Sequence, residues 1–218
     1  MLSSFIFVLI AVVQFSYRAL ITLWLRLDAK AGGIGWDSEV NPGIMNSLSG
    51  FIVMFAPLLL TDTLQQKFGL RKACSFVALA LILPLMLVSL ASALDGIAMW
   101  AYLVFMNGSA VALTTIMVSV VSIAVSNSVL PSVAGTAIGI TQAVVAFSRA
   151  IGNGGTAFLF GLLQNEGFDF PFDFHLLFVV NVLVLVAVVA LFWAGLDERI
   201  EKRKKAEVNV EMPLLSKG

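Results

Sequence analysis

Long uncharged stretches limit what this sequence can fold into more than any other feature. Asp, Glu, Lys and Arg are all missing from residues 40–61, 73–94 and 96–148. A helix needs about 20 apolar residues to cross about 30 Å of hydrocarbon, so each stretch can hold at least one membrane crossing. The whole chain is 60% hydrophobic and 12% charged, whereas soluble domains have about 45–50% apolar and about 25% charged residues. The sequence therefore predicts an integral membrane protein.

The number of crossings follows from where these stretches should be interrupted. The segment SNSVLPS at residues 126–132 contains turn-forming residues and a proline, and it should divide the longest stretch into two. We expect an all-α polytopic protein in which one bundle, residues 1–196, precedes a charged tail at 197–218. The six predicted membrane helices lie at about residues 3–25, 42–61, 73–94, 97–125, 133–163 and 174–195.

The distribution of basic residues predicts the orientation. An even number of crossings places both termini on one side of the membrane. The loop at 61–73 and the tail at 197–218 carry nine Lys and Arg residues, whereas the loop at 26–43 on the opposite side carries only Arg26 and Lys30. Cytoplasmic loops are enriched in Lys and Arg, so both termini are expected in the cytoplasm. A plasma membrane and a vacuole-type membrane both remain open.

Several classes of function receive no support. The formal net charge is zero, which gives no reason to expect a nucleic-acid partner. We find no phosphate loop, metal-binding cluster or nucleophile constellation, so we expect neither an enzyme nor a cofactor. The single cysteine, Cys74, excludes an internal disulfide and a cysteine-built metal site. The first apolar segment could be a signal peptide, but it lacks a basic start and continues to Leu25.

The loop TDTLQQKFGLRKA at residues 61–73 has an ordered pattern of basic residues around a glycine. Gly69 can adopt a positive φ, while Lys67, Arg71 and Lys72 can hold the loop at an anionic leaflet. These charges could simply determine the orientation of the chain in the membrane. The pattern also resembles the loop motif that the major facilitator superfamily carries between the second and third helices of each six-helix half.

A second segment strengthens the resemblance. Residues 130–161 are similar to the eleventh helix of the drug:proton antiporter branch, which includes the zinc-induced facilitator-like proteins. Residues 69–90 and 175–192 look like its ninth and twelfth helices. The resemblance covers nearly the whole chain but only the C-terminal half of such a transporter, and it implies two three-helix inverted repeats. The matching residues in the eleventh-helix segment are Gly135, Thr136, Ala137, Gly139, Arg149, Ala150, Ile151, Gly152 and Gly155.

The sequence also departs from this family. Asn153 stands where the family usually has proline, and Tyr17 is followed by Arg18 rather than by an acidic residue. No Asp or Glu lies inside any of the predicted spans. Proton coupling needs an intramembrane group that changes protonation, which arginine does not. The resemblance therefore implies that the coupling carboxylate belongs to an N-terminal half outside this sequence.

Two arginines lie within predicted spans. Arg149 is sixteen residues beyond Val133, or roughly 24 Å along a helix, so it should lie deep in the bilayer and face protein or water. It could bind a solute, pair with a carboxylate of another half, or stabilise helix packing. Arg18 lies about 10 Å from Leu25, so we expect its side chain to extend to the interface.

Polar side chains at mid-span depth are the candidates for lining a cavity, because an unpaired polar group is costly in hydrocarbon. They are Arg149, Gln142, Tyr17, Gln14, Asn107 and Asn181. Small residues spaced four apart form grooves where another helix can approach closely. We expect such packing at Gly135 with Gly139 and at Ser148 with Gly152, and some flexing near Gly155.

These inferences predict secondary transport of a small molecule or metal chelate, coupled to protons. The expected partners are the lipid bilayer and either a missing N-terminal six-helix half or a second copy of the chain. The alternative is a truncated or split half that does not transport alone and acts only as an assembly partner or remnant. Met1 opens almost directly on the first helix, which favours the alternative.

Overall fold

Most of the described chain is helical. The computed structural model describes residues 2–38, 40–127, 129, 134–166 and 173–195, and these ranges contain no β-strand. The helices are α1 (Leu2–Arg26), α2 (Val40–Leu87), α3 (Gly96–Asn127), α4 (Ala134–Glu166) and α5 (His175–Gly195), with two 3₁₀ turns, η1 (Ala29–Ala31) and η2 (Val88–Ala93). The prediction of an all-α chain is confirmed.

Five of the described helices are long and apolar enough to cross a membrane. Helices satisfy their backbone hydrogen bonds internally, which is what a segment in hydrocarbon requires. The predicted break at residues 126–132 lies mostly outside the described residues, between α3, which ends at Asn127, and α4, which begins at Ala134. The described chain has the architecture of an integral multi-pass membrane protein.

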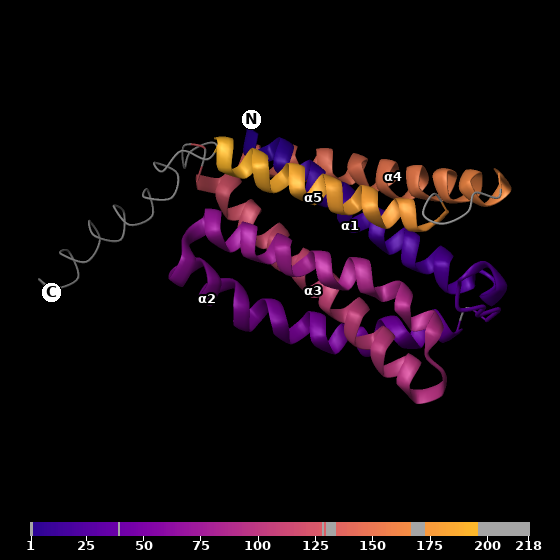
Figure 1. The fold of residues 1–218 in the computed structure, drawn as a ribbon. Coiled ribbons are helices and arrows are strands. Elements are labelled where there is room, and N and C mark those ends of the chain that lie inside the picture. The colour runs from indigo at the N-terminus through magenta and orange to yellow at the C-terminus, as the bar shows by residue number, and fades with distance from the viewer. Residues whose placement is uncertain (1, 39, 128, 130–133, 167–172, 196–218) are drawn as a thin grey trace, which may run out of the picture.

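Helix α2 reverses direction at Gly69. A straight helix of 48 residues would extend for about 72 Å, which is more than twice the thickness of a bilayer core. Gly69 has φ 74° and ψ 171°, the one non-helical conformation within α2, and the chain folds back there (Figure 1). We refer to residues 40–68 as the first limb of α2 and to residues 70–87 as its second limb.

The structure corrects the predicted loop at residues 61–73. Helix continues on both sides of Gly69. The helix that contains the span at 42–61 therefore extends beyond residue 61, and the helix that contains the span at 73–94 begins before residue 73. The charges around Gly69 had indicated a loop, but charged and amide side chains are compatible with helix where it leaves the membrane. The second limb gives way to η2 after Leu87.

The helices pack in two groups around one core. Helix α1 lies against α4, α5 and α3, while α2 lies chiefly against α3, which accepts a hydrogen bond from Ser49 on the first limb and donates one to Leu87 on the second. The core contains large, fully buried side chains from α1, the second limb of α2, and α3, among them Trp24, Leu81 and Ile116. The stacked indoles of Trp36 and Trp100, 4.7 Å apart, connect the loop after α1 to α3.

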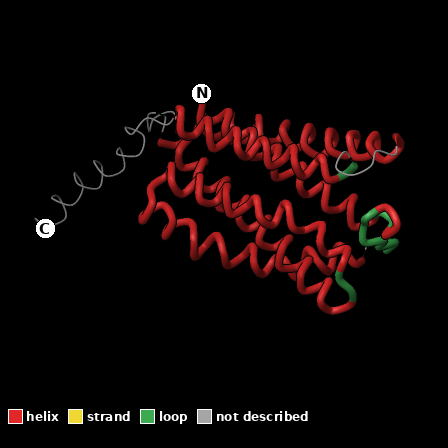
Figure 2. Tube along the Cα trace, viewed as in Figure 1, coloured by secondary structure: helices red, strands yellow, loops and turns green. Residues whose placement is uncertain are grey.

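The ends of the bundle differ in what they contain. The start of α1, the end of α5 and the reversal at Gly69 lie at one end (Figure 1). The described loops that follow α1, precede α3 and precede α5 lie at the other end (Figure 2). The predicted tail, residues 197–218, lies outside the described residues.

Candidate solute cavity

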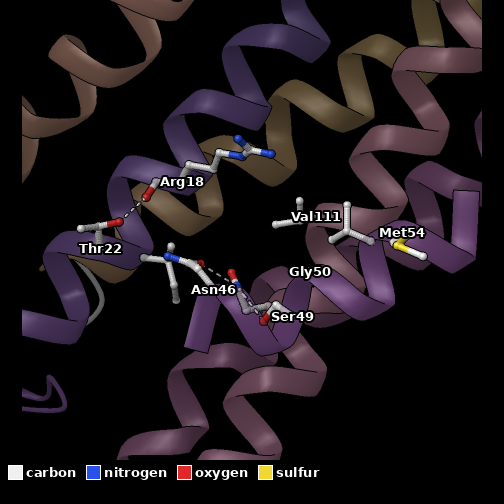
Figure 3. A pocket seen from close by; sticks show the side chains of 10 residues that line it. Arg18, Thr22, Asn46, Ser49, Gly50, Met54 and Val111 are labelled. Atoms are coloured by element: carbon white, nitrogen blue, oxygen red, sulfur yellow. Dashed lines mark hydrogen bonds between the residues drawn. The ribbon is translucent and has the colours of Figure 1, made fainter. Parts of the chain in front are cut away.

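A cavity of about 640 Å³ opens between α1, the first limb of α2, and α3 (Figure 3). This volume falls in the range of about 300–1,000 Å³ that is typical of small-molecule sites. The wall combines polar and apolar side chains. Its residues are Arg18, Ile21, Thr22, Asn46, Ser49, Gly50, Val53, Met54, Asn107 and Val111.

Hydrogen bonds at the cavity wall join the three helices. The Tyr17 hydroxyl donates to Asn107 Oδ1 at 3.3 Å. Asn107 Nδ2 donates to Asn46 Oδ1 and to Ser49 Oγ, each at 3.2 Å. The Ser49 hydroxyl donates to the Val104 carbonyl at 3.3 Å. Asn107 is only 1% exposed, and its amide is the centre that holds α1, α2 and α3 in register.

Arg18 supplies the charge at this cavity. It is the only ionisable side chain among the lining residues, and it is exposed. Figure 3 shows it on α1, across the opening from Asn46 and Ser49 on α2. The Thr22 hydroxyl donates to the Arg18 carbonyl at 2.9 Å, which satisfies that hydroxyl within α1. Arg18 was not among the residues expected to line a cavity, and the structure places it in the cavity wall.

The structure brings Tyr17 and Asn107 together but does not bring the other four candidates to the cavity wall. Arg149 is exposed on α4, and its guanidinium carbon lies 4.8 Å from the centre of the Phe15 ring. Gln142 is also exposed on α4, and Gln14 is half-buried on α1. A cation over an aromatic face is attractive at such distances, so the contact orients Arg149 against α1.

Asn181 belongs to a different polar cluster, where α1, α4 and α5 meet. Asn181 Nδ2 donates to Ser16 Oγ at 3.1 Å and to the Leu177 carbonyl at 2.9 Å. The Thr156 hydroxyl donates to Ser16 Oγ at 2.7 Å. Each of these polar atoms has a partner from the protein, and the cluster therefore connects helices rather than presenting donors to a solute.

Four polar residues of the cavity wall were not predicted from the sequence: Arg18, Thr22, Asn46 and Ser49. Two sequence features could have indicated these residues. Arg18 directly follows Tyr17, and a run of small and polar residues from Asn46 to Gly50 interrupts an otherwise apolar segment. Neither signal says which helices become neighbours. That information comes from the packing of α1 and α2 against α3.

The glycines of α4 differ in their surroundings. A Cβ on Gly152 would lie 3.0 Å from Phe15 Cβ and 3.1 Å from the Val12 carbonyl oxygen, so α1 and α4 approach closely at this point. A Cβ on Gly135, Gly139 or Gly155 would have nothing within 4 Å. Within the described chain, close approach through these glycines is thus limited to Gly152.

The exposed side of α4 divides into two stripes along the helix. One stripe has large apolar side chains and includes Ile140, Val144, Phe147, Ile151 and Phe158. The other has small or polar residues at spacings of three and four, which place them on one face. Its exposed members are Gly135, Gly139, Gln142, Ala146, Arg149, Asn153 and Ala157. We call it the polar stripe of α4.

The first limb of α2 shows the same division. Ile44, Leu48, Phe51, Phe55 and Leu58 form an exposed apolar stripe. The small and polar residues Gly43, Asn46, Ser47 and Gly50 are exposed on a different face of the limb. Lipid favours large apolar side chains, so a stripe of small and polar groups indicates contact with water or protein instead.

The basic motif surrounds the reversal of α2. Lys67 and Lys72 are exposed, while the Arg71 guanidinium carbon lies 5.6 Å from the centre of a Trp193 ring on α5. The Trp193 indole also donates to Ser75 Oγ at 2.6 Å. These contacts connect the second limb of α2 to α5 at the end of the bundle where the chain reverses.

The described residues include no group of three or more His, Cys, Asp or Glu side chains that could hold a metal ion. Comparison of the chain with protein-family models, with curated proteins and with solved structures finds no match. The described chain has the helices of a multi-pass membrane protein and a solute-sized cavity whose wall is partly polar.

Proposed function

We propose that this chain is one half of a secondary active transporter, which moves a small solute with coupling to protons. The observation that carries the proposal is the cavity of about 640 Å³, which places an arginine and neutral polar groups between apolar helices. Polar groups at membrane depth are costly, so they occur where they face water or a substrate. The bilayer and a second six-helix body are the partners that this function requires.

Six crossings are part of the proposal. Each limb of α2 is then a crossing of its own, connected by the turn at Gly69. The crossings in chain order are α1, the two limbs of α2, α3, α4 and α5. Lys67, Gly69, Arg71 and Lys72 would lie together at the cytoplasmic surface with the two termini, as the excess of basic residues suggests.

The packing of the helices supports two related three-helix units. The first crossing, α1, lies against the fifth and sixth, and the fourth crossing, α3, lies against the second and third. The third and sixth crossings also contact each other. If crossings one, two and three are exchanged in order with crossings four, five and six, each of these contacts becomes a contact that is also present. Such an exchange is expected of inverted repeats with a solute site between them.

The cavity lining includes no carboxylate. If transport is coupled to protons, the group that takes up the proton lies on another wall of the passage. The polar stripe of α4 and the small polar face of the first α2 limb are where that wall would pack. The drug:proton antiporter branch of the major facilitator superfamily, which this sequence resembles, has such a two-body organisation.

The test compares two adjacent positions on the first limb of α2. Met54 lines the cavity and is 58% exposed, while Phe55 is 52% exposed on the apolar stripe. Each is replaced by cysteine in a Cys74→Ala background and treated with a charged thiol reagent in liposomes. Only a hydrated thiol ionises to the reactive thiolate, so the residue 54 cysteine should react at least about tenfold faster. Equal rates would contradict a water-filled passage.

A second candidate function is an assembly subunit that completes a passage without transporting alone. The polar stripe of α4 favours this candidate, because its residues are exposed along the helix, although Arg149 also contacts the Phe15 ring of α1. Purified chain in liposomes is tested for uptake of labelled glucose, choline and glutarate under a pH gradient. Uptake that Asn107→Leu abolishes would support transport by the chain itself. Uptake of none of the three would favour the assembly subunit.

A further inference from the structure

We propose that the solute held in this cavity is an anion, bound through a carboxylate or similar oxyanion by Arg18 and Asn46. This inference rests on the proposed function, since it names the class of solute for the same cavity. Two observations support it. No described residue of the cavity wall carries a charge opposite to that of Arg18, and the hydrogen bonds of the wall leave the amide donor of Asn46 facing the opening.

No described residue of the cavity wall compensates the charge of Arg18. Arg18 is the one ionisable residue of the ten that form the wall. Its guanidinium makes no hydrogen bond and no ion pair with any residue in the described part of the chain. A guanidinium stays protonated at every accessible pH. A cation between apolar helices is costly without a partner, so a bound anion would be favoured by the electrostatic field of the site.

The neutral polar groups of the cavity wall also favour an anion. Tyr17 donates to Asn107 Oδ1, and Asn107 in turn donates through Nδ2 to Asn46 Oδ1. The Asn46 oxygen is thereby occupied, while the amide Nδ2 of Asn46 has no acceptor among the described residues. An asparagine amide nitrogen has two donor hydrogens and no acceptor capacity. The network therefore orients Asn46 so that it presents donors to the cavity.

The geometry suits an oxyanion better than a neutral solute or a cation. A guanidinium forms two parallel hydrogen bonds with a carboxylate, which is the strongest pairing open to it. Arg18 and Asn46 face the opening from different helices, α1 and α2, so an anion between them would contact both (Figure 3). Ile21, Val53, Met54 and Val111 supply an apolar surface beside it. A carboxylate with an apolar body matches this wall.

The experiment measures how well solutes protect the residue 54 cysteine from the thiol reagent in the Met54→Cys, Cys74→Ala chain. Benzoate and glutarate are compared with their neutral amides, benzamide and glutaramide, which have nearly the same shape. Carboxylates should slow the labelling and amides should not. Arg18→Gln should raise the concentration for half-protection at least about tenfold, equivalent to about 1.4 kcal/mol. Arg18→Lys, which keeps the charge, should retain part of the protection.

Arg149→Gln is the matched control, because it removes the other arginine of the predicted spans, one that does not line the cavity. Its protection should equal that of the parent. Protection by amides as strong as by acids, or protection unchanged in Arg18→Gln, would overturn the anion assignment. So would rapid labelling that no carboxylate slows. Slow labelling without any solute, equal at positions 54 and 55, would instead mean that the proposed function fails.

An anionic lipid headgroup presents similar chemistry, and the same assay separates it from a soluble anion. Labelling is compared in nanodiscs of phosphatidylcholine with and without phosphatidylglycerol. Protection by benzoate in pure phosphatidylcholine supports a soluble solute. Protection only by phosphatidylglycerol would assign the site to lipid and overturn the proposal.

Discussion

Gly69 shows how one residue determines the path of the chain. Its φ of 74° and ψ of 171° belong to a backbone region that is essentially restricted to glycine. The sequence suggested a positive φ at this position, and that expectation is confirmed. The reversal allows a stretch of 48 residues to return along the bundle rather than extend beyond it.

We predict that Gly69→Ala destabilises the protein by about 1–3 kcal/mol, because alanine in this conformation is strained. The midpoint of thermal unfolding in detergent measures the effect. Gly135→Ala is the control, since this helical glycine has open space around its Cα. The control should leave the midpoint unchanged or raise it slightly, as alanine favours helix. Equal midpoints for the two variants would refute the strain argument.

Asn107 and Arg18 illustrate a second point at the residue scale. Asn107 is buried and its amide is fully engaged by Tyr17, Asn46 and Ser49. Arg18, which directly follows Tyr17 in the sequence, has an exposed side chain at the cavity. The first stabilises the contact between helices, and the second is available for a solute. Polar residues at similar depth thus have different roles, depending on whether their partners are inside the protein.

At the scale of elements, the contact between α1 and α4 depends on a missing side chain. Gly152 lies against the backbone of α1, with the Val12 carbonyl oxygen and Ser16 nitrogen 3.1 and 3.2 Å from a Cβ position. The neighbouring residue Ser148 is buried at 1% exposure. The spacing of four places both on the face toward α1, where the small residues let the helices approach.

We predict that Gly152→Leu forces α1 and α4 apart, at a cost of about 1–3 kcal/mol or more from overpacking. Gly155→Leu lies less than one turn along the same helix, but a Cβ there has nothing within 4 Å. The control should therefore unfold at the same temperature as the parent, while Gly152→Leu should unfold at a lower temperature. A loss of stability in both variants would point to glycine flexibility in α4 rather than to packing.

At the scale of the whole molecule, the positions of the helix ends determine which residues would lie on the same side of a membrane. The start of α1, the end of α5 and the turn at Gly69 lie at one end of the bundle (Figure 1). The loop before α3 lies at the other end. If the bundle spans a bilayer, Lys67 and Asp95 must lie on opposite sides, because a limb of α2 separates them.

We predict that Lys67→Cys and Asp95→Cys, each in the Cys74→Ala background, react with impermeant reagents from opposite sides of the membrane. Both residues are exposed near the ends of helices. Lys67 should react from the cytoplasmic side by the excess of basic residues around it. Labelling of both positions from the same side would contradict separate crossings by the two limbs. Lack of reaction at Lys67 would mean that α2 does not reverse at the membrane surface.

The sequence by itself determined the class of the chain and the content of its elements. Uncharged stretches such as 73–94 can only be buried in lipid or protein, and helix is the structure that satisfies their backbone there. The positive φ of Gly69 followed from local residue types, because turns depend on nearby atoms. The boundaries at 61 and 73 did not follow, since polar residues such as Gln65 and Gln66 are compatible with both loop and helix.

Only the tertiary structure decided which polar residues form a site. Arg149 and Arg18 are both arginines within apolar helices, and depth alone favoured Arg149. The packing of α1 and α2 against α3 places Arg18 and Asn46 in the wall of one cavity, whereas Arg149 is exposed on α4 and is not part of that wall. The physical reason is that a site depends on which helix faces turn toward each other. These rotations are determined by contacts between distant residues, such as Asn107 with Tyr17 and Asn46.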